Sequence, residues 1–321
     1  MKLLSWISAT LVLALTSCDR GADPSTDGTF RVVATTSMIA DVARQIAGPD
    51  AEVTALMGEG VDPHLYQPLR GDIAQLQAAD LILYNGVLLE GKMTGTIERF
   101  AKGGTRTLAV AEMPGLIDEA EGKHDPHVWM DVKLWAQAAG RICDALCDAD
   151  PENAAAYRQR HEAYAAELAE LDDRVRQAIA TIPEDRRVLV TAHDAFGYFS
   201  RAYGIEVRGI QGISTESEAG LKDLEALIQV LVERRIPAVF VESSIPRKSV
   251  EALVEGARAK GHEVKIGGVL FSDSMGRAGS YEGTYIGMID HNVTSLTQAL
   301  GGSVSPGGLF GKLPTTHDTA P

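Results

Sequence analysis

The sequence is short of cysteine and of positive charge. It contains 3 cysteines, and 30 basic residues stand against 44 acidic ones, which gives a net charge of -14 at pH 7. Cys143 and Cys147 lie four residues apart on an expected helix, where their Cβ atoms would be roughly 5–6 Å apart, wider than a disulfide usually allows. We therefore expect two buried apolar side chains rather than a disulfide, a soft-metal site or a redox site. The acidic balance argues against a nucleic-acid backbone as a partner and favours a cationic ligand.

Long apolar runs are also scarce, and the run at residues 3–15 is too short to favour a membrane span. It leads into Leu-Thr-Ser-Cys18, which resembles a bacterial lipobox, in which the cysteine becomes the lipidated first residue. We expect a signal peptide over residues 1–17 and lipidation at Cys18, with cleavage of an ordinary secretory signal nearby as the alternative. Residues 18–29 are mostly Asp, Gly, Ser, Thr and Pro and are expected to be a flexible tether.

Alternating strand and helix patterns predict an α/β fold with parallel sheets. With 45% hydrophobic residues, 321 residues are enough for two lobes, each able to bury its own core. Residues 31–36 and 81–84 have the apolar character of strands, and residues 37–47 have helical spacing. Strands that alternate with helices indicate parallel βαβ packing. We expect the N-terminal lobe to cover residues 30–149.

A long helix is predicted between the two halves of the chain. Asp150-Pro-Glu-Asn is a strong helix start, with Asp150 as N-cap and proline at the first helical position. Residues 154–180 then run without glycine or proline, and a helix of about 30 residues would be roughly 45 Å long. We expect residues 150–182 to form one stiff linking helix, with a coiled-coil arm as the alternative.

The second half of the chain repeats the alternation. Strand patterns such as residues 188–192 are interleaved with helical patterns such as residues 221–234. A C-terminal lobe over residues 183–300 is therefore expected. The chain then turns rich in Gly, Ser, Pro and Thr, so residues 301–321 are expected to be a disordered tail.

Three histidines stand at loop positions close to expected strand ends. His64 and His127 each close an Asp-Pro-His tripeptide, and His193 follows the strand pattern Val-Leu-Val-Thr-Ala. Any one of them alone would more often be a hydrogen-bonded structural residue. However, parallel strands point their carboxyl ends at a common ligand crevice, and Asp273 adds a carboxylate after another extended segment. Such a His₃Asp set suits Zn²⁺ and other first-row divalent ions better than Ca²⁺ or Mg²⁺.

The motifs around these four residues occur in the order of one known family. They are Gly-Val-Asp-Pro-His64-Leu-Tyr-Gln-Pro, His-Asp-Pro-His127-Val-Trp-Met-Asp, Thr-Ala-His193-Asp-Ala-Phe-Gly-Tyr-Phe and Leu-Phe-Ser-Asp273-Ser-Met-Gly. The sequence resembles the TroA-like zinc and manganese solute-binding proteins, the cluster A-I metal-binding lipoproteins of ABC importers. The resemblance covers residues 31–300 and includes Asn85-Gly-Val-Leu-Leu-Glu-Gly, Gly212-Ile-Ser-Thr-Glu-Ser-Glu and Val241-Glu-Ser-Ser.

The resemblance implies two βα lobes joined by one long spine helix, with the metal site in the cleft between the lobes. The implied metal ligands are His64, His127, His193 and Asp273. It also implies one divalent ion per chain as cargo, an ABC permease and its ATPase as partners, a monomeric state, and a location in the periplasm or on the outer face of the cytoplasmic membrane. Asp125 and Glu216 are candidates for acceptors that fix imidazole tautomers, and His124 is the nearest rival ligand.

The identity of the ion stays open between Zn²⁺ and Mn²⁺. Family members dedicated to manganese often carry Glu where this chain has His193, which favours zinc. Zinc-dedicated members often insert a His- and Asp-rich loop before the second ligand, yet residues 113–123 contain no histidine. By the Irving–Williams order, the purified protein should bind Zn²⁺ more tightly than Mn²⁺ whichever ion it serves in the cell.

Two other functions could use the same residues. A secreted zinc hydrolase needs an open coordination position and a nearby general base, and the sequence contains neither His-Glu-x-x-His nor Gly-x-Ser-x-Gly. A metal-stabilised adhesin-type surface lipoprotein would release its ion slowly, with unfolding. An importer component must hand its ion on, so we expect a solute-binding protein and not an enzyme.

Overall fold

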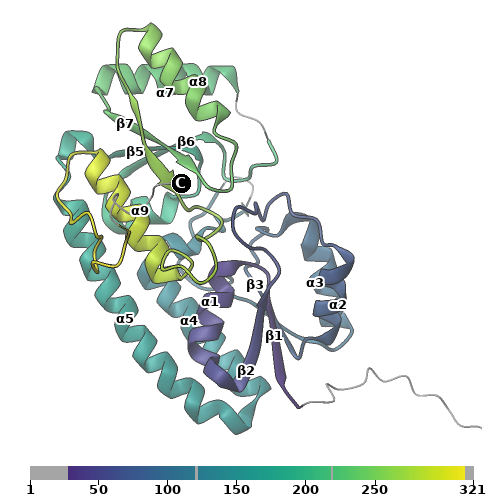
Figure 1. Ribbon diagram of the computed structural model, residues 1–321. Coiled ribbons are helices and arrows are strands. Elements are labelled where there is room, and N and C mark those ends of the chain that lie inside the picture. The colour runs from purple at the N-terminus through teal and green to yellow at the C-terminus, as the bar shows by residue number, and fades with distance from the viewer. Residues whose placement is uncertain (1–27, 120–121, 218–219, 315–321) are drawn as a thin grey trace, which may run out of the picture.

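The chain forms two α/β lobes joined by one long helix, as the sequence predicts. The computed structural model describes residues 28–119, 122–217 and 220–314. Figure 1 shows the N-terminal lobe in purple and blue, the C-terminal lobe in teal-green to yellow, and the long helix α5 (Ala154–Ala180) along one side of both. The expected signal peptide and Cys18 lie outside the described residues. Within the described ranges, no helix combines the length and apolar character that a membrane crossing requires.

The N-terminal lobe is built on a parallel four-stranded sheet. Its strands are β1 (Phe30–Ala34), β2 (Ala51–Ala55), β3 (Leu81–Tyr84) and β4 (Arg106–Ala109), in the order β2-β1-β3-β4. Its helices are α1 (Ser37–Ala47), α2 (Arg70–Ala78), α3 (Thr94–Lys102) and α4 (Val132–Ala149). Helix α1 begins where the Thr36 hydroxyl accepts the backbone N–H of Ile39 and ends at Gly48, whose φ of 56° suits glycine. Cys143 and Cys147 are free and buried on α4, as predicted.

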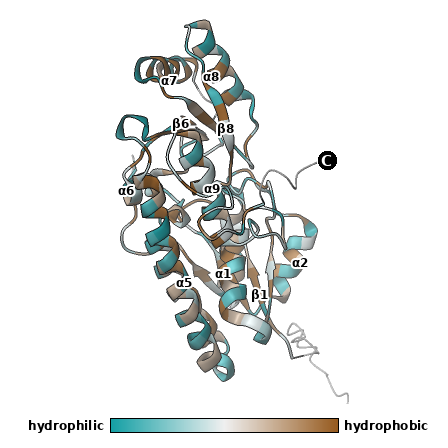
Figure 2. Cartoon of the chain, turned by 60° about the vertical axis from the view of Figure 1, so that its left-hand side comes forward, coloured by the Kyte–Doolittle hydropathy of each residue, from teal (hydrophilic) through white to brown (hydrophobic). Residues whose placement is uncertain are grey.

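Helix α5 starts later than the sequence suggests. Pro151–Asn153 forms a 3-10 turn, and the α-helix proper begins at Ala154. Asp150 does not cap the backbone, because its carboxylate accepts the side chains of Asn153 at 2.8 Å and Tyr157 at 2.5 Å. The helix has 27 residues, about 40 Å at 1.5 Å per residue. Polar and apolar residues alternate along α5, in teal and brown in Figure 2. The large residues that the helix buries include Tyr157, Tyr164, Leu168, Leu171 and Val175.

The C-terminal lobe contains two parallel strand pairs. β5 (Val188–His193) pairs with β6 (Glu206–Gln211), and β7 (Ala238–Glu242) pairs with β8 (Lys265–Leu270). β5 and β7 are neighbours, so the strand ends of both pairs meet at one edge. The helices of this lobe are α6 (Gly197–Tyr203), α7 (Leu221–Arg234), α8 (Lys248–Ala259) and α9 (Tyr285–Ala299).

The largest hydrophobic core is shared between the lobes. It runs from Val32 in the first sheet through Trp135 on α4 and Leu168 on α5 to Phe240 and Val293 in the C-terminal lobe. Smaller cores lie on the outer side of each lobe. Because close-packed interiors resist deformation, a continuous core favours small relative movements of the lobes over wide opening.

The expected disorder from residue 301 is wrong for residues 301–314. Leu309 and Phe310 pack against the shared core. The buried carboxylate of Asp290 on α9 accepts the backbone N–H of Leu309 at 2.6 Å, and the Arg174 guanidinium lies 4.7 Å from the Phe310 ring centroid. A buried carboxylate needs hydrogen-bond donors, and this segment supplies them. Residues 315–321 lie outside the described residues.

Candidate metal centre

Four side chains that are distant in sequence converge between the lobes. His64 lies in the loop after β2, and His127 immediately precedes the 3-10 turn Val128–Met130. His193 is the last residue of β5, and Asp273 follows β8. Each residue offers one nitrogen or oxygen atom, and these atoms lie within 4.8 Å of one another. The structure thus brings together the four residues that the sequence singled out.

The spacing of these atoms fits a tetrahedral ion. The Nε2 atoms of His64 and His127 are 3.3 Å apart, and His127 Nε2 lies 3.4 Å from Asp273 Oδ1. Asp273 Oδ2 lies 3.2 Å from the Nε2 of His193 and 3.9 Å from that of His64. Ligands at about 2.0–2.1 Å from a tetrahedral ion are about 3.3 Å from one another. These separations therefore leave room for one first-row ion at the centre.

Three atoms at this point lack hydrogen-bond partners in the described structure. They are His193 Nε2 and both carboxylate oxygens of Asp273, all buried. The Nε2 of His193 lies 3.2 Å from Oδ2 of Asp273, which is within ion-pair distance, but the two atoms do not have hydrogen-bond geometry. Buried polar atoms in proteins almost always have a partner. Buried nitrogen and oxygen atoms that lack partners and face one point therefore indicate that a ligand binds between them.

Two buried carboxylates hold two of the imidazoles in place. Asp125 accepts the backbone N–H of His127 at 2.9 Å and lies 2.7 Å from its Nδ1. Glu242, the last residue of β7, accepts the backbone N–H of His193 at 2.9 Å and lies 2.6 Å from its Nδ1. A carboxylate on Nδ1 keeps the proton there and leaves Nε2 to face an ion.

Glu242, and not the candidate Glu216, is placed beside the third imidazole in position to fix its tautomer. Within the described residues, the side chain of Glu216 makes no hydrogen bond to a candidate ligand, and it is exposed on the C-terminal side of the cleft. Glu242 belongs to the Val-Glu-Ser-Ser motif. Its position at the end of an apolar strand is the sequence feature that could have marked it as a candidate acceptor. Its role depends on β7 lying beside β5, which the sequence alone does not specify.

The three imidazoles of the site have different pKa values. Burial lowers the pKa of His64 to about 4. Burial also disfavours the charged form of His127, but the Asp125 and Asp273 carboxylates raise its pKa to about 9. Glu242 and Asp273 likewise outweigh burial and raise the pKa of His193 well above its usual value. Conversely, His193 and His127 overcome the effect of burial and hold the pKa of Asp273 well below its usual range. An arriving cation therefore replaces protons on two imidazoles and finds the third already neutral.

Among the residues that the structure describes, the other histidines lie outside the cluster. His124, the nearest rival, is half-exposed, and its Nδ1 lies 3.0 Å from Asp118 Oδ1. His262 and His291 each place Nε2 at 2.9 Å from a backbone carbonyl oxygen, of Ile236 and Val269 respectively. None of them points a ring nitrogen at the four-residue cluster.

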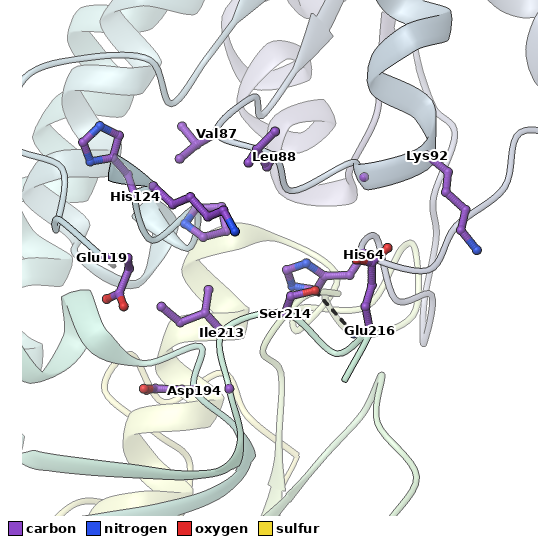
Figure 3. A pocket seen from close by; sticks show the side chains of 14 residues that line it. His64, Val87, Leu88, Lys92, Glu119, His124, Asp194, Ile213, Ser214 and Glu216 are labelled. Atoms are coloured by element: carbon purple, nitrogen blue, oxygen red, sulfur yellow. Dashed lines mark hydrogen bonds between the residues drawn. The ribbon is translucent and has the colours of Figure 1, made fainter. Parts of the chain in front are cut away.

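A cavity of about 720 Å³ opens over the cluster between the lobes. Of the four candidate ligands, only His64 lines it. Figure 3 shows His64 beside Ser214 and Glu216, with Ile213 below them in the view and Leu88 above. If all four candidate residues bind one tetrahedral ion, no coordination position is left for a catalytic water. The arrangement suits binding and release of an ion rather than catalysis.

Comparisons with known proteins agree over most of the chain. Residues 32–299 match the profile of the family described as zinc-uptake complex component A, periplasmic (ZnuA). The zinc-binding protein TroA of Treponema pallidum is 49% identical over 281 residues, which cover 87% of this chain and 91% of TroA. The manganese-binding lipoprotein MntA of Bacillus subtilis is 49% identical over 292 residues, which cover 89% of this chain and 95% of MntA.

Solved structures show the same architecture. The structure of the periplasmic zinc-binding protein TroA from Treponema pallidum superposes with a TM-score of 0.83 at 48% identity, and covers 85% of this chain and 99% of that one. The Fe(III)-bound YtgA of Chlamydia trachomatis has a TM-score of 0.79 at 25% identity, and covers 86% and 100% of the two chains. On the profile match and these two relatives at 49% identity, the chain belongs to the ZnuA family of periplasmic zinc-uptake components.

Proposed function

We propose that this protein is the extracytoplasmic solute-binding component of an ABC importer, and that it captures one Zn²⁺ or Mn²⁺ ion and delivers it to a membrane permease driven by its ATPase. The proposed ligands are His64, His127, His193 and Asp273. The observation that carries this proposal is the set of unpartnered, buried donor atoms on His193 and Asp273 at tetrahedral spacing from the other two imidazoles. As a member of this family, the chain is a solute-binding protein and not an enzyme.

Both ions fit the proposal. Relatives with equal identity are named for zinc in one case and for manganese in the other. Three imidazoles with one carboxylate suit either ion, and the Irving–Williams order gives Zn²⁺ the higher intrinsic affinity. Competition between the two ions in cells, rather than affinity in the test tube, therefore decides which one is the cargo.

The division of the ligands between the lobes provides a route for release. In the proposed domain organisation, His64 and His127 belong to the lobe at residues 30–149, and the other two ligands belong to the lobe at residues 183–300. Residues 150–182 link them. A small separation of the lobes would then break several metal–ligand bonds together.

The proposal includes a lipid anchor at Cys18 and a monomeric protein held at the outer face of the cytoplasmic membrane or in the periplasm. Residues 1–17 would be removed as a signal peptide, and residues 18–29 would be the tether. The lipobox-like sequence before Cys18 supports this, as do relatives named as lipoproteins. Mass spectrometry of the membrane-extracted mature protein would detect the acylated cysteine, and an unmodified N-terminus elsewhere would contradict the anchor.

Uptake of radioactive ions tests the function directly. In cells that lack their own binding component, the wild-type chain should restore accumulation of zinc or manganese. Asp273→Ala should not, at equal protein level, because the site then loses its only carboxylate ligand. The proposal fails if wild-type protein restores neither ion, or if Asp273→Ala restores uptake as well as wild type.

A further inference from the structure

The loop that carries His64 is tied to the opposite lobe at two points. The backbone N–H of Gly60 donates to Ser274 Oγ at 3.1 Å, next to the ligand Asp273. The hydroxyl of Thr215 donates to Asp62 Oδ2 at 2.7 Å. Both bonds cross from the N-terminal to the C-terminal lobe. The position of this loop therefore depends on how closely the lobes approach.

Asp62 connects one of these ties to the ligand itself. Its Oδ1 accepts the backbone N–H of His64 at 2.9 Å, while its Oδ2 accepts the Thr215 hydroxyl. One carboxylate thus joins a C-terminal-lobe side chain to the backbone of a candidate ligand. Thr215 is buried, so water competes little for its hydroxyl.

His64 is positioned differently from the other two imidazoles. The Nδ1 atoms of His127 and His193 face the buried carboxylates of Asp125 and Glu242. Among the described residues, no carboxylate pairs with the Nδ1 of His64. The orientation of His64 therefore rests on its backbone, which Asp62 holds.

The N-terminal lobe limits where the His64 backbone can go. Gly91 has a φ of 32°, and a Cβ atom there would lie 2.9 Å from the carbonyl oxygen of His64. The loop at residues 86–91 thus packs directly against the His64 backbone, and movement in that direction is blocked. The space available to the His64 side chain is the cavity of about 720 Å³ that it lines.

We propose that the Thr215–Asp62 hydrogen bond is a latch across the cleft, and that Thr215 and Asp62 are positioning residues that hold His64 on the ion. When the lobes separate, the latch opens and His64 is free to turn away from the ion toward the cavity, together with the loss of the bonds that cross the cleft. This inference rests on the proposed function, because it concerns the release of the same ion. It assigns a role to Thr215 of the Gly-Ile-Ser-Thr-Glu-Ser-Glu motif, which takes no part in the ligand set.

Release kinetics of the full chain loaded with Zn²⁺ test the latch. The rate of transfer to excess chelator is measured for wild type, Thr215→Val, Thr215→Ser and Ser214→Ala. Valine keeps the shape and removes the hydroxyl, and serine keeps the hydroxyl. Ser214 is the neighbouring hydroxyl, and within the described ranges its one hydrogen bond stays in its own loop, from the Glu216 N–H. We expect release about tenfold faster for Thr215→Val and within about twofold of wild type for the other two variants.

A double variant separates the latch from a general loss of stability. Asp62→Ala breaks both bonds of the carboxylate, so adding Thr215→Val to it should not speed release further. The latch is refuted if Thr215→Val releases Zn²⁺ at the wild-type rate, if Thr215→Ser is as fast as Thr215→Val, or if the effects of Asp62→Ala and Thr215→Val multiply. A wild-type chain that binds no Zn²⁺ would instead refute the proposed function.

Discussion

The bond between Glu242 and His193 makes the sharpest prediction about affinity. Glu242 lies 2.6 Å from the Nδ1 of His193 and accepts its backbone N–H at 2.9 Å, in a fully buried position. Glu242→Gln keeps the shape but replaces one oxygen with an NH₂ group. Whichever way the amide turns, this NH₂ faces an N–H group of His193. The variant therefore loses one charge-assisted hydrogen bond and gains a contact between two donors.

The size of the effect follows from these contacts. A buried hydrogen bond to a charged group contributes about 1.5–3 kcal/mol, and loss of such a carboxylate partner commonly weakens metal binding roughly 10- to 100-fold. We expect Glu242→Gln to weaken Zn²⁺ binding by that factor, measured by competition with a chromophoric chelator at constant pH. Glu225→Gln, the same chemical change on the exposed side of α7, is the matched control and should bind like wild type. An affinity for Glu242→Gln within about twofold of wild type would refute the argument.

Three further predictions concern protons, stability and the C-terminal segment. Because the pKa of His127 is raised to about 9 and that of His193 is also raised, Zn²⁺ must displace both protons, so affinity should increase as the pH rises from about 6 to 8. Calorimetry in buffers of different ionisation enthalpy should detect release of about two protons per ion at neutral pH, and proton-free binding would contradict this. Zn²⁺ at 100 times its Kd should raise the free energy of unfolding by about 2.7 kcal/mol. A melting temperature that changes with neither added metal nor added chelator would contradict specific binding to the folded state. Asp290→Ala should lower the free energy of unfolding by about 2 kcal/mol and expose the segment around Leu309 to protease, because this carboxylate accepts bonds from two side chains and two backbone N–H groups; unchanged melting and proteolysis would mean that Asp290 does not anchor the segment.

The parts of the fold that the sequence predicts are those with local signals. The helical spacing of residues 37–47 matches the bounds of α1, and the strand Leu81–Tyr84 follows from its apolar run. The four candidate ligands were also recognisable, because they stand in ordered motifs beside expected strand ends. Local chemistry was sufficient in each of these cases.

The parts that the sequence does not predict depend on contacts between distant residues. Glu242 and His193 are 49 residues apart in the sequence, and Glu242 reaches the imidazole only because β7 lies beside β5. The order of residues 301–314 depends on the buried carboxylate of Asp290, which composition does not reveal. The late start of α5 reflects side-chain bonds to Asp150 that compete with capping. In each case a tertiary contact outweighs the local preference.

The stoichiometry of metal binding tests the central claim most directly. The chelator-stripped, tag-free chain is reloaded with Zn²⁺ or Mn²⁺ and analysed beside His64→Ala and Asp273→Ala, with circular dichroism as the control for folding. The account predicts one tightly bound, exchangeable ion per wild-type chain and clearly weaker binding in both folded variants. Absence of a stoichiometric ion in the wild-type chain, or binding that is indifferent to both substitutions, would contradict the four-residue metal site.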